Sequence, residues 1–192
     1  MIDAFLNHTD EQLMALIRER NREAFAVLYD RYSARLMGYF MKMLANNREL
    51  CEDLLQELFL KIARQPELFD TDRIFRPWVY TIAQNLCKME YRKKSTRGVA
   101  VALDVTHELT DSGRSQSDTL DRKEFMTRLR EVLLDIGEPH KSTFVMRYFE
   151  ELSLKEISDI HHCSEGTVKS RLFYTIRKIA ARLPQFKHLV AS

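Results

Sequence analysis

The stretch that decides the fold is SLKEISDIHHCSEGTVKSRLFYTIRKIAARL, residues 153–183. Ser153 and Glu156 have the spacing of a capping box, which predicts that a short helix begins there. The run His161-His162-Cys163 predicts a turn, and Ser164 is placed to cap a second helix that continues to the end of the stretch. A short helix, a tight turn and a longer basic helix are typical of a helix-turn-helix.

The longer helix separates an apolar face from a polar one. Its apolar residues recur at helical spacing and form the predicted buried stripe: Val168, Leu172, Ile176, Ile179 and Leu183. A second face carries only hydroxyl groups, cations and one aromatic ring: Thr167, Ser170, Arg171, Tyr174 and Lys178. Such side chains can bind base edges and phosphates, so this face is predicted to enter the major groove of DNA. The alternative is an ordinary amphipathic helix with a basic outer face.

The turn residues His161, His162 and Cys163 are all of metal-binding types. Three adjacent residues of a turn cannot easily converge on one tetrahedral ion, and no further ligand cluster is near in the sequence. We therefore predict turn and packing roles, with no metal and no cofactor. The other two cysteines, Cys51 and Cys87, are far away, so no disulfide framework is visible and a reducing compartment is indicated.

The first half of the chain predicts a second helical block. Thr9 and Gln12 fit a capping box, and a long amphipathic helix follows with apolar residues from Phe25 to Leu44. A third helix is predicted over residues 49–64. A fourth, with Pro77 in its first turn, continues to about residue 94 and is predicted to turn four residues inward: Trp78, Ile82, Leu86 and Met89.

A composition shift separates the two blocks. Residues 110–119 are wholly polar and cannot bury enough surface to fold, so we predict a flexible linker. The apolar segment Val99–Val105 is either a short strand or an extended docking segment. The sequence thus predicts an all-α protein with helical domains at 1–97 and 120–192, joined by a flexible linker at 98–119.

Charge is strongly segregated along this chain of 192 residues, although 30 basic and 28 acidic side chains nearly cancel. Residues 73–97 hold seven basic and one acidic side chain, and residues 164–182 hold five and one. Residues 49–70 and 99–121 each have a net charge of −4. Two basic stretches separated by acidic ones indicate a polyanion contacted at two places, the alternative being solvated helix faces.

Two faces of the first block also carry polar groups beside apolar ones. On the third helix, Asp53, Glu57 and Lys61 share an outer face, with Gln56 and Leu60 beside it. On the fourth, a polar face lies beside Trp78 and Tyr80: Thr81, Asn85, Lys88 and Arg92. Amides and cations next to aromatic rings can hold a single strand whose bases stack on the rings. The alternative for Trp78 is a place in the core.

Three motifs resemble one family. Residues 53–61, DLLQELFLK, resemble the acidic motif of sigma region 2.2, and residues 75–85, FRPWVYTIAQN, resemble regions 2.3 and 2.4. Residues 152–157, LSLKEI, and 164–172, SEGTVKSRL, resemble region 4.2. Order and spacing agree as well. The chain therefore resembles an extracytoplasmic-function (ECF) sigma factor, the two-domain class of bacterial sigma factors.

The resemblance implies a role for each motif. In region 2.2 it implies contact with the clamp helices of the polymerase β′ subunit, through Asp53, Gln56, Glu57 and Phe59. It implies recognition and melting of the −10 promoter element, with a base flipped near loop 69–75, through Trp78, Thr81, Asn85, Lys88, Arg92 and Lys93. It implies reading of the −35 element through Ser164, Thr167, Lys169, Ser170, Arg171, Tyr174 and Lys178.

The resemblance further implies partners. These are core RNA polymerase, including the β flap near Phe144, Tyr148 and Phe149, promoter DNA and an anti-sigma factor. One departure is Glu165, which favours the helix dipole but repels phosphate at the mouth of the reading helix. The free protein is expected to be a monomer. It is expected in the cytoplasm without direct membrane insertion, since the sequence has no apolar run near the roughly 20 residues of a membrane span and no signal peptide.

The predicted function is therefore to direct core polymerase to promoters and to help open the −10 element. An enzyme is not expected, because no nucleophile–base pair, phosphate loop or metal-spaced cluster is visible. A helix-turn-helix regulator with a sensing or dimerising first half is the main alternative. The acidic third helix next to a basic, tryptophan-bearing fourth helix argues against it. A helical adaptor would leave the basic face unexplained.

Overall fold

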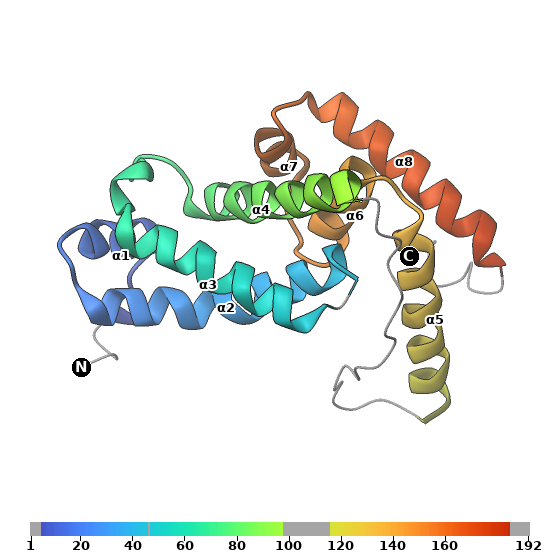
Figure 1. Cartoon of the computed structure of the whole chain (residues 1–192), viewed down its shortest axis with the longest axis horizontal. Coiled ribbons are helices and arrows are strands. Elements are labelled where there is room, and N and C mark those ends of the chain that lie inside the picture. The colour runs from blue at the N-terminus through green and yellow to red at the C-terminus, as the bar shows by residue number, and fades with distance from the viewer. Residues whose placement is uncertain (1–4, 46, 98–115, 185–192) are drawn as a thin grey trace. The chain divides into compact units, whose positions relative to one another are not determined.

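The computed structural model describes residues 5–45, 47–97 and 116–184, and every regular element in these ranges is helical (Figure 1). The described residues belong to two compact units. One unit carries α1 to α4, and the other carries α5, α6 and α8, with α7 joining α6 to α8 in the chain. The predicted all-α class with two helical domains is confirmed. The segment Val99–Val105 lies outside the described residues.

The first unit is built on helices that begin at side-chain caps. Thr9 and Gln12 form the predicted capping box, with bonds of 3.2 Å to the Gln12 N–H and 2.9 Å to the Thr9 N–H. Asn21 and Asn47 cap the next two helices through their side-chain oxygens. The bounds are α1 Asp10–Arg18, α2 Arg22–Met43, α3 Arg48–Arg64, the 3-10 turn η2 Pro66–Leu68 and α4 Phe75–Arg97.

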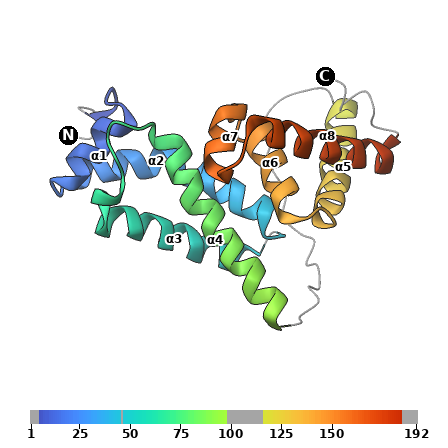
Figure 2. The ribbon, with the colours of Figure 1, turned by 90° about the horizontal axis from the view of Figure 1, so that it is seen from above.

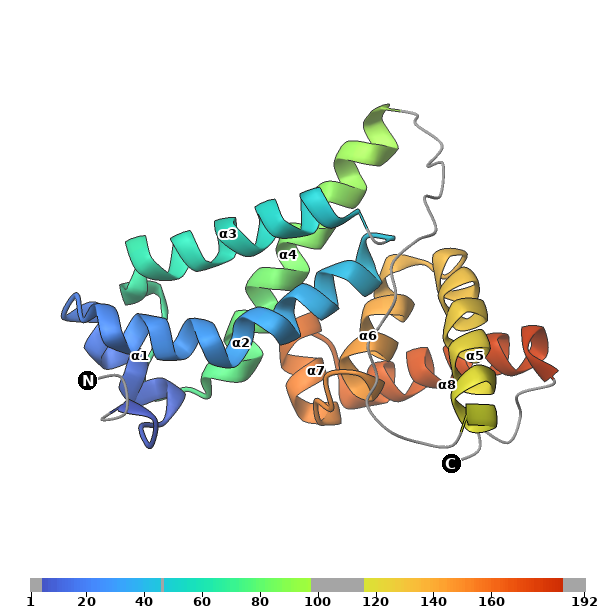
Figure 3. The ribbon, with the colours of Figure 1, turned by 90° about the horizontal axis from the view of Figure 1, so that it is seen from below.

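The core of this unit lies between α2, α3 and α4. Figures 2 and 3 show α2 and α3 side by side with α4 crossing them, and these helices contact one another. Tyr39 of α2 and Tyr80 of α4 are fully buried, with ring centroids 5.6 Å apart. The Tyr39 hydroxyl donates a hydrogen bond to Gln84, which satisfies that buried amide oxygen.

The inward face of α4 differs from the predicted one. Met89 is 48% exposed, so its predicted place in the core is wrong. The buried arc is centred on Val79, Ala83 and Cys87, all fully buried. The predicted stripe lies about one residue's rotation to one side of that arc, so its middle is buried while its two ends reach solvent. Periodicity alone could not choose between the two stripes, because α4 is apolar over more than half its circumference.

The second unit contains α5 Gln116–Leu134, α6 Glu138–Tyr148, α7 Leu154–His161 and α8 Glu165–Arg182. Helix α6 packs against α8, and α5 also contacts α8. Helix α5 begins at Gln116, so it includes the last four residues of the predicted linker. Extending an existing helix by one turn costs little, and serine and aspartate are tolerated in a first turn. A polar composition therefore did not mark the helix start.

The predicted capping box before α7 is present, with bonds of 2.8 Å and 3.1 Å between Ser153 and Glu156. On α8, the predicted buried stripe is correct except at one residue. Ile176 is half-buried, whereas Thr175 is buried and donates its hydroxyl to the Arg171 carbonyl at 2.8 Å. That intrahelical bond removes the usual cost of burying a hydroxyl, so a threonine can occupy the core face.

Candidate nucleic-acid and protein interfaces

The outer face of α3 gathers most of the predicted protein-binding residues. Asp53, Gln56 and Glu57 are exposed and line a shallow hollow of about 380 Å³. The rest of the lining comes from the same face of α3 and from the residue that follows the helix: Leu60, Lys61, Arg64 and Gln65. Acidic groups occupy its N-terminal half and basic groups its C-terminal half, with Leu60, 49% exposed, in between. Such a face suits an elongated partner of complementary charge.

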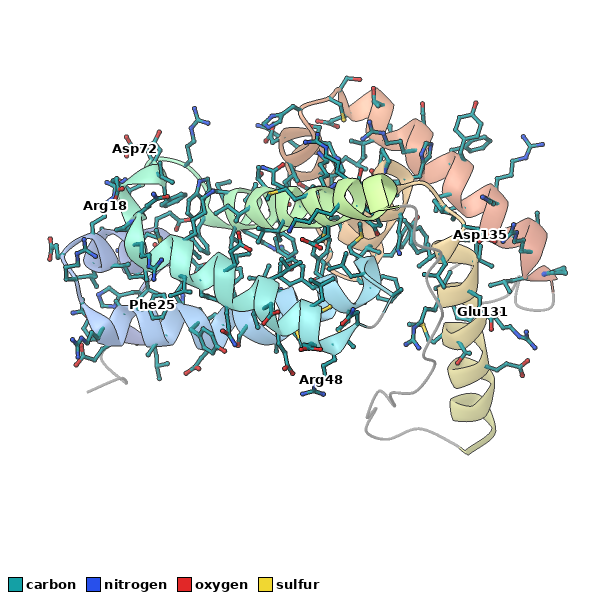
Figure 4. All side chains as sticks on the ribbon, viewed as in Figure 1. Arg18, Phe25, Arg48, Asp72, Glu131 and Asp135 are labelled. Carbon is teal, nitrogen blue, oxygen red and sulfur yellow. The ribbon has the colours of Figure 1, made fainter. Side chains whose placement is uncertain are left out.

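Phe59 does not belong to this face. It is only 3% exposed, and its ring packs on Tyr29 at 4.6 Å and on Phe25 at 6.1 Å between centroids. Phe25 is labelled on α2 in Figure 4. The expected direct contact of Phe59 with a partner is therefore wrong, because the α2–α3 interface buries the side chain. Its contribution is to hold α3 on α2.

Loop 69–75, which leads into α4, is built around an aromatic cluster. Phe69 and Phe75, the two ends of the loop, are fully buried with ring centroids 5.4 Å apart. Trp78 is half-buried and packs on both rings, at 5.0 Å and 5.6 Å. Between these anchors the loop reaches solvent, and Ile74 is 66% exposed. Trp78 thus has both the packing of a core residue and an accessible part.

Helix α1 contacts both ends of this loop. The Arg18 guanidinium donates to the carbonyl of Pro66 at 3.4 Å and to that of Phe69. The Glu11 carboxylate accepts a hydrogen bond of 2.9 Å from the Phe75 N–H, at the start of α4. The sequence contained no sign of these contacts, since they join residues 48 to 64 positions apart.

The pKa of Glu11 is consistent with its hydrogen bond to the start of α4. Burial works to raise the pKa of its carboxyl group, but the hydrogen bonds that the carboxylate accepts, chiefly from the Phe75 N–H, hold the pKa below its usual value. The charged form of Glu11 is therefore the one that the fold stabilises.

The polar face of α4 carries the remaining residues predicted to read a single strand. Asn85, Arg92 and Lys93 are exposed and Lys88 is half-buried. The Lys93 ammonium pairs with Glu90 at 2.6 Å. Thr81 donates its hydroxyl to the Pro77 carbonyl at 2.8 Å, so only its acceptor lone pairs face outward. Tyr80 is fully buried, and the expectation that it stacks on a base is wrong.

The start of α8 presents its predicted residues to solvent. Ser164 accepts a bond of 3.1 Å from the Thr167 N–H, and the two hydroxyl oxygens lie 3.0 Å apart. Lys169 and Ser170 are exposed, although Lys169 lies nearly opposite Thr167 and Arg171 on the helix, and Tyr174 is 60% exposed. Arg171 is half-buried, with its guanidinium 4.0 Å from Cys163 Sγ.

The far end of α8 is attached to the end of α5. Lys178 donates to the Asp135 carbonyl at 2.7 Å, and Arg182 pairs with the Asp135 carboxylate. Figure 4 labels Asp135 at the end of α5 nearest to α8. The hydrogen bond and charge of Arg182 hold the pKa of Asp135 below its usual value. Lys178 therefore has an intramolecular partner besides its predicted role toward DNA.

The prediction missed exposed apolar side chains on the same elements. Phe173 is 61% exposed and its ring lies 5.7 Å from that of Tyr174. Leu68, just before loop 69–75, and Ile74, within it, are also exposed. Phe173 follows the buried Leu172 directly, so counting positions on the helical wheel would have placed it outside the buried stripe.

Comparison with known proteins identifies both units. The Sigma-70 region 2 family matches residues 28–97, and the Sigma-70 region 4 family matches residues 135–181. ECF RNA polymerase sigma factor SigL of Mycobacterium tuberculosis is 30% identical over 162 residues, which cover 82% of this chain and 88% of SigL. The chain belongs to the ECF sigma factors.

Other similarities agree with this family. ECF RNA polymerase sigma factor SigW of Bacillus subtilis is 29% identical over 81% of this chain and 87% of its own. The structure of CnrH, solved in complex with the cytosolic domain of CnrY, has a TM-score of 0.69 at 20% identity and covers 92% of this chain and 97% of that one. At this identity the match concerns the fold.

As an ECF sigma factor, the protein directs core RNA polymerase to promoters and takes part in initiating transcription there. Sigma factors are regulatory initiation factors. In the part of the chain that the structure describes, no helix combines the length and apolar character needed to cross a bilayer. Nor do three or more His, Cys, Asp or Glu side chains gather there in a way that could hold a metal ion.

Proposed function

We propose that the two units divide the contacts of this sigma factor. Residues 1–97 bind core polymerase and the −10 element, residues 120–192 bind the −35 element, and residues 98–119 link them. The observation that carries this division is that each unit presents a separate polar face next to a packed core, α3 and α4 in one and α8 in the other. The charged side chains on these faces suit binding to the polymerase or to a polyanion such as DNA.

Docking on core polymerase uses the hollow on α3. Asp53, Gln56 and Glu57 contact the β′ clamp helices, with the two carboxylates facing basic groups of the polymerase. The exposed Leu60 in the middle of the hollow adds apolar contact area. A partner helix laid along this face would meet acidic groups first and basic groups last, which defines its direction.

Recognition of the −10 element uses α4 and the loop before it. Trp78 offers a half-buried ring beside the loop, and Asn85 offers an exposed amide about two turns further along the same face of α4. Thr81 contributes acceptor lone pairs. The cations Lys88, Arg92 and Lys93 bind phosphates of the opened strand.

Recognition of the −35 element uses α8. Arg171, Thr167 and Ser170 lie within one turn of each other and are positioned to reach base edges in the major groove. Ser164, Lys169, Tyr174 and Lys178 bind the flanking phosphates. Glu165 sits in the first turn, where it favours the helix dipole and lowers the affinity for a nearby phosphate.

The proposal includes further partners and properties. An anti-sigma factor binds the chain, as CnrY binds CnrH and as NepR binds the sigma factor RpoE of Bartonella quintana, which has a TM-score of 0.64 to this chain at 17% identity. The apolar surface near Phe144, Tyr148 and Phe149 contacts the β flap. The free protein is a cytoplasmic monomer, and it regulates initiation without catalysing a reaction of its own.

The docking assignment is tested by charge reversal on α3. Glu57→Lys is expected to abolish co-elution with core polymerase, because it places a cation against the basic groups of the polymerase that the Glu57 carboxylate faces. The control is Glu52→Lys, which has the same charge change on the same helix but does not line the hollow. Glu52 forms only an exposed pair with Arg48, at 2.7 Å, so its loss has little effect on folding. Retention of Glu57→Lys at the level of the parent would overturn the assignment.

A further inference from the structure

We propose that helix α1 is the positioning element of the −10 reading loop, holding its two ends through Arg18 and Glu11. The inference rests on the proposed −10 role of loop 69–75. Neither residue is among those assigned to DNA. Both act through the backbone of the loop, and the spacing between them along α1 sets the distance between the two anchoring points.

The first anchoring point lies where α3 and η2 end. Carbonyl groups at a helix end have no intrahelical donor and carry partial negative charge. Arg18 donates to the carbonyls of Pro66 and Phe69 with its fork of N–H groups, and the Pro66 carbonyl also accepts a bond of 3.3 Å from the Phe69 N–H. Arg20 adds a bond of 3.3 Å to the carbonyl of Ala63. Arg18 in the last turn of α1 and Arg20 just after it thus place cations against carbonyl groups at the C-terminal ends of η2 and α3.

The second anchoring point lies where α4 begins. The Phe75 N–H has no intrahelical acceptor, and it carries partial positive charge. Glu11 supplies a carboxylate at 2.9 Å, which caps α4 from a different helix. An anion from α1 thus meets the positive end of α4, so both charges of the clamp have the sign that the adjoining helix end favours.

The two anchoring residues also have the right spacing. Glu11 and Arg18 are seven residues apart, so they share one face of α1 and lie about 10 Å apart along its axis. A second link supports the same end of the loop: Asp10 accepts from the Tyr32 hydroxyl, and the Tyr32 ring packs on Phe75 at 5.1 Å. Contacts from the first and the last turn of α1 therefore connect it to the loop.

The loop between the anchors is short and exposed. Asp70 accepts a bond of 3.1 Å from the Asp72 N–H and pairs with Arg73 at 3.5 Å. Figure 4 labels Asp72 at the loop tip and Arg18 below it. Reading a base needs groups held to within about 0.5 Å, and a loop reaches that precision only when other residues support it. Fixing both ends from one rigid helix supplies this support.

The test uses holoenzyme reconstituted from core polymerase and the full chain. Run-off transcription is measured on template pairs that share one −35 element and differ at single −10 positions, starting from a promoter selected from genomic fragments. Arg18→Ala and Glu11→Ala are expected to reduce discrimination between −10 sequences on the order of tenfold, the effect of losing a charge-assisted hydrogen bond. The dependence on the −35 element should stay the same.

A second readout examines the loop without DNA or polymerase. Trp78 is the only tryptophan of the chain, and it packs on Phe69 and Phe75. Its fluorescence therefore reports the packing of both loop ends. Acrylamide quenching is expected to increase in Arg18→Ala and in Glu11→Ala. The milder Glu11→Gln keeps an acceptor for the Phe75 N–H and should retain most of the protection.

Two control variants separate positioning from general effects. Glu19→Ala removes an exposed carboxylate at the end of α1, and Arg48→Ala removes an exposed guanidinium that pairs with Glu52 on α3. Both should match the parent in selectivity and in quenching. Circular dichroism of each variant checks that the helices remain.

The outcomes distinguish the inference from the proposed function. Loss of −10 selectivity with intact helices, partly restored in Glu11→Gln, supports the clamp. Unchanged −10 selectivity together with unchanged quenching of Trp78 in both alanine variants overturns the clamp. Loss of polymerase binding, or of helix content, in both alanine variants also overturns it. A parent that does not discriminate between −10 sequences overturns the proposed role of the loop, and the quenching of Trp78 then decides by itself whether α1 holds the loop.

Discussion

The −10 loop and helix α8 present their DNA-facing residues by different structural means. On α8, the groups that position Thr167 and Ser170 are local, because Ser164 caps the helix three residues before Thr167. In the loop, the supporting groups come from residues 48 to 64 positions away on α1. A single helix is set up by its own sequence, whereas a loop needs other elements to hold it.

The loop and α8 also differ in whether their aromatic side chains are buried or exposed. Phe69 and Phe75 are fully buried beneath the loop, while Phe173 and Tyr174 are exposed on α8 by 61% and 60%. The two phenylalanines at the loop ends therefore serve folding, and the two aromatic rings on α8 are available to a partner. Substitutions in the two places should separate stability from binding.

The largest expected effect is on stability. Phe75→Ala should lower the free energy of unfolding of the first unit by about 3–5 kcal/mol, because it leaves a cavity among Tyr32, Phe69 and Trp78. Phe173→Ala should change it by less than about 0.5 kcal/mol. Urea titrations followed by circular dichroism measure both. Equal losses in the two variants would contradict the comparison.

The next effect is on promoter use. Arg171→Ala should lower run-off transcription by a factor equivalent to about 1–3 kcal/mol, as expected for a lost contact with a guanine. The effect should disappear on templates whose −35 element is scrambled. Arg177→Ala, an exposed cation on the same helix outside the predicted set, is the control. If both variants lose activity equally, Arg171 contributes only charge.

Helix caps give an intermediate effect that depends on the unit. Ser164→Ala and Thr9→Ala should each lower stability by about 1 kcal/mol, since each removes the acceptor of a first-turn N–H. Their effects on transcription should differ: Ser164→Ala should weaken discrimination at the −35 element, and Thr9→Ala at the −10 element. Run-off assays on the two template series measure this. The reverse assignment would contradict the division of contacts.

The smallest effect concerns the attachment of α8 to α5. Arg182 lowers the pKa of Asp135 in the folded state, so the ionised pair adds stability above the usual pKa of 3.8 and loses it as pH falls through the lower, folded value. Asp135→Asn should remove this part of the acid dependence. Unfolding midpoints between about pH 5 and pH 2 measure it for parent and variant. A parent curve that matches the variant would show that the pair adds nothing, as exposed pairs often do.

Several parts of the fold follow directly from local sequence. The caps at Thr9, Ser153 and Ser164 are present as predicted, because capping depends on residues three positions apart. The exposure of Asp53 and Glu57 on α3 also follows from helical spacing. In each case a short-range geometric rule leaves one arrangement.

Other parts depend on packing between helices. Phe59 of α3 and Tyr80 of α4 were expected at interfaces with partners, and packing against α2 buries both instead. Met89 was expected inside and is exposed. A helix with apolar residues around much of its circumference has several possible inward faces, and only its neighbours select one.

The sequence by itself determined the helical class, the helix-turn-helix, the family and the helices that carry the polar faces, because these depend on spacing within one segment and on motif order. The tertiary structure decided which aromatic residues are buried, which way α4 faces and that Arg18 and Glu11 meet the ends of loop 69–75. These features arise between segments far apart in the chain. Their geometry is set when side chains of different helices compete for the same space in the core.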